Sequence, residues 1–281
     1  MSHPLTVPVG ATARRPLWSD LPDAVRAIIE DHLGSRVVDA TSQGSGYTPG
    51  FASRLRLSDG GRVFAKAAYG KYEWMLRAYR QEAAKLALLP TAVPAPTLRW
   101  SFDDLVDSDP WVILIMDDID GRSPHRPWQQ AEAELVLDTV SRMSQALTPP
   151  PAPPAGQPWL TFAEEFAGEL GNWDLVPHEG IWRDHGAEAA AMTRRAIELC
   201  HGNTLLHCDL RDDNLIIDTA GAAWVCDWNF PIVGPAWIDQ VALLISMSGD
   251  GLDADALLAR SPGRRRSWRS TRRPDRAMRD R

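Results

Sequence analysis

The sequence predicts an α+β protein with a strand-rich first part and a mostly helical second part. Between residues 37 and 116, apart from a helical stretch at 72–89, apolar residues recur with a period of two, and turn residues separate the runs. Beyond residue 126 the apolar spacing becomes helical, apart from one short hairpin between residues 215 and 225. A chain of 281 residues can bury a large core, as one domain or as two lobes.

Composition excludes several classes of protein. The apolar content of 44% and the charged content of 24% are typical of soluble globular proteins. The longest purely apolar run, 111–116, is too short to span a membrane, and no signal peptide is visible. Three cysteines without C-x-x-C spacing indicate a reducing, cytoplasmic compartment and argue against a zinc site or a disulfide framework.

Charge is spread unevenly along the chain. The net charge is −7, but residues 260–281 carry ten arginines and two aspartates, so the tail is +8 and the body −15. An acidic body suits a cationic small molecule and disfavours nucleic acid. The sequence gives no indication of oligomeric state.

The first part predicts a small sheet with two helices. Residues 1–18 are proline-rich and are expected to form a flexible arm. Ser19 and Asp20 are expected to cap a helix that ends before Gly34. Strands are expected from residue 37 and over 52–57, 62–67, 97–102 and 111–116, with a helix over 72–89.

A glycine-containing loop, which includes Gly44, Ser45 and Gly46, separates the first two predicted strands. Glycine lets backbone N–H groups approach a phosphate closely. The spacing G-x-G-x-x-x-G differs from the G-x-G-x-x-G of protein kinases, and a plain hairpin loop explains it equally well.

Lys66 and Glu82 form the next candidate pair. Lys66 shares a strand face with Phe64, although an isolated lysine of this kind is more often a solvated edge residue. Glu82 lies on the apolar stripe of the helix, where an unpaired carboxylate is costly, so we expect it to pair with Lys66. Glu73, at the helix start, is the less favoured partner.

The stretch between residues 205 and 239 carries the strongest chemical signal. His207, Asp209 and Asn214 follow the spacing H-x-D-x-x-x-x-N. Apolar runs at 215–217 and 222–225 predict a hairpin that would bring Asn214 close to Asp227. Phosphoryl transfer needs such a set, namely one carboxylate for the attacking hydroxyl and an amide and a second carboxylate for magnesium. The alternative is that these residues are turn formers or caps.

This segment resembles the aminoglycoside phosphotransferase family, small-molecule kinases with the protein-kinase-like fold. That family usually carries His-Gly-Asp-Leu-x-x-x-Asn, then Asp-Trp, then Gly-Pro or Gly-x-Pro and an Asp. The chain has His207-Cys208-Asp209-Leu210 with Asn214, Asp227-Trp228, Gly234-Pro235 and Asp239, with Cys208 in place of the usual glycine.

The resemblance implies a bilobal fold with a β-rich N-lobe at 19–117, a hinge at 118–121 and a helical C-lobe at 122–260. It also implies that Asp209 is the catalytic base, that Asn214 and Asp227 bind Mg²⁺, and that His207 and Asp239 support the loop. The backbone of the hinge, marked by Met116 and Asp118, would bind adenine. The acidic run at 117–120 is equally explained as a solvated turn.

The second lobe is expected to contain helices over 127–147, 162–170, 187–200, 237–247 and 252–258, with a proline-rich loop at 149–158. Residues 261–281 are expected to be disordered. The family continues with further helices, so we expect these to be truncated here. A slip of the coding frame near Pro262 is one hypothesis, and a basic arm for nucleic acid is the alternative.

The predicted reaction moves the γ-phosphoryl group of ATP, or of GTP, to a hydroxyl of a small molecule, with Mg²⁺ bound. The acidic body and the resemblance favour an aminoglycoside-like antibiotic or amino sugar, and hence a role in antibiotic resistance. A nucleotide-binding protein without transferase activity, a kinase for another small alcohol and a protein kinase are the alternatives. Only six residues separate Asp227 from Gly234, which leaves little room for the activation loop of a protein kinase.

Overall fold

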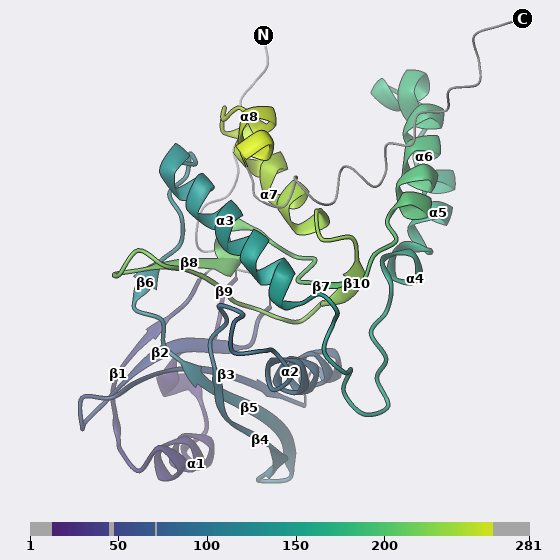
Figure 1. Cartoon of the computed structure of the whole chain (residues 1–281). Helices are drawn as coiled ribbons and strands as arrows, with labels where there is room; N and C mark the ends of the chain where they lie inside the picture. Colours follow the sequence, from purple (N-terminus) through teal and green to yellow (C-terminus); the bar gives the residue numbers. More distant parts are fainter. Residues whose placement is uncertain (1–12, 45–47, 71, 261–281) are drawn as a thin grey trace, which may run out of the picture. The chain divides into compact units, whose positions relative to one another are not determined.

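The structure is a computed structural model that describes residues 13–44, 48–70 and 72–260. The chain divides into two compact units (Figure 1). The first comprises Met1–Leu89, Pro94–Arg126 and Asp212–Asn229, and the second comprises Pro90–Val93, Pro127–Arg211 and Phe230–Arg281. Most of the expected arm, the loop residues Ser45 and Gly46, and the arginine-rich tail lie outside the described residues.

The first unit is built on a five-stranded antiparallel sheet with the strand order β1-β2-β3-β5-β4. The predicted strands are confirmed as β1 (Val37–Ser42), β2 (Phe51–Leu57), β3 (Arg62–Tyr69), β4 (Leu98–Val106) and β5 (Asp109–Asp117). The β4–β5 hairpin is longer than the sequence indicated. Asp107 and Ser108 form its two-residue turn with φ of 52° and 74°, a conformation usually marked by glycine or asparagine.

Two helices cover opposite faces of this sheet. Helix α1 (Asp23–Leu33) buries Val25 and Ile29 in a core that includes Val63 and Ala65 of β3. Helix α2 (Glu73–Leu86) packs on the other face, because its Glu82 contacts Lys66. Lys66 follows Ala65 in β3, so the two side chains point to opposite faces of the sheet. The apolar face of α2 therefore agrees with the sequence pattern.

The start of α1 differs from the prediction. Trp18–Asp20 form a separate short 3-10 helix, η1, in which the Asp20 carboxylate accepts a hydrogen bond from the Leu17 N–H at 2.8 Å. Pro22 precedes the first helical residue, and its fixed φ suits that position. Gly34 ends the helix in the left-handed conformation, as its place in the sequence indicated.

The hairpin between residues 215 and 225 belongs to the first unit. It consists of β8 (Leu215–Asp218) and β9 (Ala223–Val225), and β8 also pairs with the short strand β6 (Gly121–Arg122). The Asp218 carboxylate stabilises the turn by accepting hydrogen bonds from the N–H groups of Ala220 and Ala222 at 2.9 and 2.8 Å. The predicted hairpin is therefore confirmed.

The second unit is mostly helical (Figure 1). Helix α3 (Gln130–Ala146) packs against α7 (Ile238–Gly249), and the short strands β7 (Thr204–Leu206) and β10 (Ile232–Gly234) pair antiparallel. The remaining helices are α4 (Phe162–Phe166), α5 (Glu169–Asn172), α6 (Ile181–Leu199) and α8 (Ala254–Arg260), with the 3-10 helices η2 (Trp173–Leu175) and η3 (Asp212–Asn214), the latter in the first unit.

Two helix boundaries predicted for this unit are wrong. The helix expected over 162–170 is broken into α4 and α5 around Gly168, a residue of low helix propensity. The helix expected over 187–200 begins earlier, at Ile181, after Gly180 with φ of 55°. None of the described helices combines the length and the apolar character needed to cross a membrane.

Candidate active site

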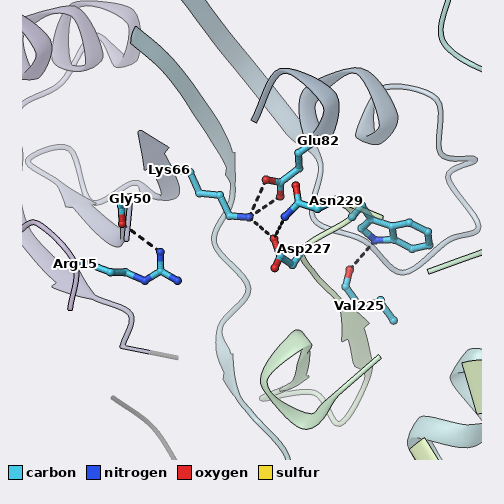
Figure 2. Close-up of polar contacts among 8 residues, drawn as sticks. Arg15, Gly50, Lys66, Glu82, Val225, Asp227 and Asn229 are labelled. Atoms are coloured by element: carbon cyan, nitrogen blue, oxygen red, sulfur yellow. Dashed lines mark hydrogen bonds and ion pairs between the residues drawn. The ribbon is translucent and has the colours of Figure 1, made fainter. Parts of the chain in front are cut away.

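Lys66 is the centre of a buried polar cluster in the first unit. Its Nζ donates to both carboxylate oxygens of Glu82, at 2.7 and 2.8 Å, and to Oδ1 of Asp227 at 2.8 Å (Figure 2). The side chains of Lys66 and Glu82 are 13% and 1% exposed. The pairing expected from the sequence is confirmed, and Glu73 is exposed at the helix start. The sequence did not indicate the direct contact between Lys66 and Asp227.

The electrostatics of this cluster follow from two carboxylates sharing one ammonium group. Burial alone would lower the pKa of Lys66, but the charges of Asp227 and Glu82 outweigh it and raise this pKa above its ordinary value. Burial raises the pKa of Glu82, the charge of Lys66 opposes this rise, and the like charge of Asp227 adds to it. The cluster thus holds Lys66 in its charged form.

Asn214 and Asp227 are brought together by the hairpin. Leu215 pairs with Val225, and the Cys226 N–H donates to the carbonyl of Asn214 at 2.9 Å. Asn214 is 4% exposed. The two expected cation ligands therefore flank a hydrogen-bonded end of the β8–β9 hairpin, as their positions in the sequence suggested.

Two residues beside Asp227, Asn229 in the segment that follows it and Lys85 on α2, were not among the site residues predicted from the sequence. Nδ2 of Asn229 donates to Oδ1 of Asp227 at 2.6 Å, and Lys85 donates from α2 to the carbonyl of Asn229 at 2.5 Å. Trp228 is fully buried and donates from Nε1 to the carbonyl of Val225 at 3.1 Å. Lys85 follows Glu82 by three residues, so helical periodicity could have placed both on the same side of α2.

The donor set fits a hard divalent cation. The described residues contain no group of three or more histidine, cysteine, aspartate or glutamate side chains suited to a metal. Mg²⁺, however, is typically held by only one or two carboxylates together with water and phosphate oxygens. Asp227 supplies a carboxylate, Asn214 an amide, and Oδ1 of Asn229 is a buried oxygen without a hydrogen-bond partner among the described residues. Such oxygen atoms are the ligands that a hard divalent cation prefers.

The glycine loop is described only in part. The carbonyl of Gly44 accepts a hydrogen bond from the Ala13 N–H at 3.1 Å, while Ser45 and Gly46 lie outside the described residues. Gly50, at the far end of the loop, is tightly enclosed, because a Cβ there would lie 2.6 Å from Oη of Tyr79. A side chain at this position would have to displace Tyr79 and Met75, a constraint that the spacing of the glycines did not reveal.

The predicted hinge is tied to the sheet by arginines. Met116 pairs with Phe64 of β3 and is 4% exposed, so its side chain belongs to the core. The Asp118 carboxylate lies 2.7 Å from Arg62 and 3.2 Å from Arg54. The carboxylate of Asp118 is thus paired within the protein. The role of the hinge backbone in binding the nucleotide stays a prediction.

Asp209 belongs to the second unit, in a loop braced by Asp239 of α7. The carboxylate of Asp239 accepts hydrogen bonds from the N–H groups of His207 and Cys208, each at 2.9 Å. His207 is fully buried, and its Nδ1 accepts a hydrogen bond from the Asp209 N–H at 3.3 Å. The roles expected for Asp239 and His207 as supports of this loop agree with these contacts.

Two further features of this loop went unnoticed in the sequence. Nη1 of Arg211 lies 2.6 Å from Oδ1 of Asp209, so an arginine accompanies the expected base. Cys208 has φ of 65°, a conformation that glycine adopts without steric cost. Burial, with the charges of nearby carboxylates, raises the pKa of the Cys208 thiol to about 12.

Comparison with known proteins supports the same class of molecule. The model of the phosphotransferase enzyme family (APH) matches residues 52–272. A comparison with curated proteins found no match. Among solved structures, the amicoumacin kinase hAmiN in complex with AMP-PNP, Ca²⁺ and Ami has a TM-score of 0.59 and 11% identity, over 85% of this chain and 77% of that one.

Two other solved structures show the same fold. The GDP and kanamycin complex of APH(2")-IIia has a TM-score of 0.57 and 15% identity, over 83% of this chain and 84% of that one. The macrolide 2'-phosphotransferase MphH from Brachybacterium faecium has a TM-score of 0.54 and 17% identity, over 86% of this chain and 84% of that one. At these identities the structural likeness establishes the kinase-like fold, with a β-rich part and a helical part.

Proposed function

Because this chain belongs to the phosphotransferase enzyme family, we propose that it transfers the γ-phosphoryl group of ATP to a hydroxyl group of a small molecule. The acceptor we propose is an aminoglycoside-like antibiotic or amino sugar, and GTP is the alternative donor. One of the similar solved structures is named as a complex with GDP and kanamycin, and another as a complex with AMP-PNP and Ca²⁺. A third is named as a macrolide 2'-phosphotransferase.

The buried contact of Lys66 with Glu82 carries this proposal. Burying a lysine and a glutamate removes both charges from water, which costs free energy even when they pair. Apolar side chains of similar size would often stabilise the fold equally well, so we expect this pair to serve the function of the protein. In kinase-like phosphotransferases such a lysine neutralises the charge of the nucleotide phosphates. The additional contact with Asp227 links the lysine to an expected cation ligand.

The remaining roles follow from the chemistry of the side chains. Asp209 accepts the proton of the acceptor hydroxyl, which for a positioned base contributes about 10²–10⁴-fold to the rate. Asn214 and Asp227 would hold a divalent cation, which supplies positive charge against the phosphates when bound. Arg211, at 2.6 Å from Asp209, orients that carboxylate.

The charge of the chain favours a cationic acceptor. Residues before the arginine-rich tail carry a net charge of −15. Aminoglycosides are polycations, and an acidic surface raises their local concentration and their rate of association, an effect that salt weakens. A neutral alcohol would not respond to ionic strength in this way.

The test is a screen of phosphate transfer from ATP and from GTP, with Mg²⁺, to a panel of amino sugars, macrolides and amino alcohols. We expect turnover on an amino sugar, and a loss of at least about 100-fold in kcat for Asp209→Asn, with nucleotide binding retained. Arg80→Gln, which removes an exposed ion pair with Asp103, serves as the matched surface control. Binding of nucleotide without turnover on any acceptor would instead favour a nucleotide-binding protein.

A further inference from the structure

We propose that Asn229 is a third protein ligand of the divalent cation, through its side-chain oxygen Oδ1. The proposal rests on the proposed function, since it concerns the cation that accompanies the nucleotide. It goes beyond the pair Asn214 and Asp227, to which the sequence pattern assigns the cation. The residue lies two positions after Asp227 and within the same unit.

The local backbone places Asn229 against Asp227. Asp227 has φ of 66°, in the left-handed region, and the Asn229 N–H donates to the Asp227 carbonyl at 2.9 Å. This tight turn folds the Asn229 side chain back, so that Nδ2 reaches Oδ1 of Asp227 at 2.6 Å (Figure 2). The amide group of Asn229 is therefore next to the carboxylate that is expected to bind the cation.

Helix α2 holds this arrangement from the other side. Lys85 donates to the carbonyl of Asn229 at 2.5 Å, and Glu82, one turn earlier, pairs with Lys66. Lys66 in turn donates to the same oxygen of Asp227 that accepts from Asn229. Asp227 and Asn229 lie in the loop after β9, but contacts with β3 and α2 hold both residues in place, as a metal site with a defined geometry requires.

The oxygen of the Asn229 amide is the observation that favours a ligand over a simple support. This atom is buried and has no hydrogen-bond partner in the described part of the chain. Leaving a buried polar atom unpaired costs free energy, and such an atom usually marks an ion or a water that completes the site. If Asn229 served only to orient Asp227, its donor group would suffice and the oxygen would be a net cost.

The chemistry of the neighbourhood selects the kind of ion. Amide and carboxylate oxygens are hard ligands that suit Mg²⁺ or Mn²⁺. Two carboxylates, Glu82 and Asp227, both pair with the ammonium group of Lys66. A cation at the Asp227 carboxylate would also give the unpaired oxygen of Asn229 a partner.

Mn²⁺ binding to the full-length chain tests the proposal directly. Free Mn²⁺ is followed by electron paramagnetic resonance in the presence of AMP-PNP, and AMP-PNP binding without a cation is measured separately by calorimetry. We expect Asn229→Ala to weaken Mn²⁺ binding about 10-fold or more, as for other residues that contact or orient metal ligands, and to leave cation-free nucleotide binding within about twofold. Asn172→Ala, at an exposed asparagine of α5, is the control.

A second variant separates a ligand from a mere hydrogen-bond donor. Asn229→Asp keeps an oxygen for the cation but loses the donor to Asp227, so the proposal requires Mn²⁺ affinity at least equal to that of the wild type. Affinity that falls as far as in Asn229→Ala would overturn the proposal and leave Asn229 as a support for Asp227. If Asn229→Ala does not fold, the Asn229→Asp result decides alone.

The outcomes also distinguish this proposal from the proposed function. If the wild-type chain binds no Mn²⁺ together with AMP-PNP, the phosphotransferase assignment of the site fails. If the wild type binds and Asn229→Ala binds equally well, only the role given to Asn229 is wrong.

Discussion

At the scale of single residues, the buried pair of Lys66 and Glu82 makes stability depend on pH. Replacing Lys66 by methionine would leave the Glu82 carboxylate buried beside Asp227 without its ion-pair partner, at a cost of about 3–5 kcal/mol. The pKa of Glu82, already raised by burial, would rise further. A carboxyl group with a raised folded-state pKa stabilises the fold below its unfolded pKa and loses that contribution as the pH rises through the folded value.

The deficit of Lys66→Met relative to the wild type should therefore be larger at pH 8 than at pH 5, as measured by urea denaturation. The double variant Lys66→Met/Glu82→Gln removes both charges and should recover part of the loss. If the deficit is the same at both pH values and the double variant recovers nothing, then the interaction between the two charges does not contribute to the free energy of unfolding.

Cys208 is a second residue whose effect is local and measurable. Its φ of 65° costs a side chain with a Cβ about 1–2 kcal/mol. Alanine retains that cost and glycine does not, although glycine loses more chain entropy on folding. We expect Cys208→Gly to be more stable than Cys208→Ala by up to about 1 kcal/mol in thermal or urea unfolding. Equal stabilities would show that the loop carries no strain at this residue.

At the scale of elements, the segment that follows β5 is held by Arg54 of β2. This arginine donates to the carbonyls of Ile119 and Gly121, at 2.9 and 3.1 Å, and lies 3.2 Å from Asp118. Three contacts from one side chain fix the backbone at 118–121, which we expect to bind the adenine ring. Ordering that backbone in advance removes an entropic cost from nucleotide binding.

Arg54→Met should therefore weaken nucleotide binding several-fold and raise amide hydrogen exchange at residues 118–122, with a smaller effect on kcat. Arg99→Met, which breaks an exposed ion pair with Asp117 of the neighbouring strand, is the matched control. Unchanged exchange at 118–122 would contradict the role given to Arg54.

Some contacts between these elements could be predicted from the sequence, and others could not. Alternation in β3 and the apolar stripe of α2 placed Lys66 against Glu82, because a buried carboxylate leaves few choices of partner. The hairpin placed Asn214 near Asp227, because its two strands follow one another closely in the sequence and pair antiparallel. Asn229 and Arg54 were missed because their contacts depend on a left-handed residue and on strand register across 65 or more residues, neither of which leaves a periodic signal.

At the scale of the whole molecule, the three cysteines report on the two units separately. Cys226 lies in the first unit, and Cys200 and Cys208 lie in the second. Burial raises the pKa of all three thiols, to about 12 for Cys208 and Cys226. An unfolded thiol has a pKa near 8.5, so a thiol with a raised folded-state pKa stabilises the fold below about pH 8.5 and loses this contribution as the pH rises toward the folded value.

Thiol modification at pH 8 should consequently be slow in the native chain and fast once a unit unfolds, because the thiolate is the reacting species. Site-resolved labelling across a urea series would then give an unfolding curve for each unit. A nucleotide analogue with Mg²⁺, at 100 times its dissociation constant, should stabilise the unit that binds it by about 2.7 kcal/mol. We expect the Cys226 curve to shift by at least as much as the Cys200 curve, since Lys66 and Asp227 belong to the unit of Cys226. A shift confined to Cys200 would place the nucleotide contacts elsewhere and refute the site built around Lys66.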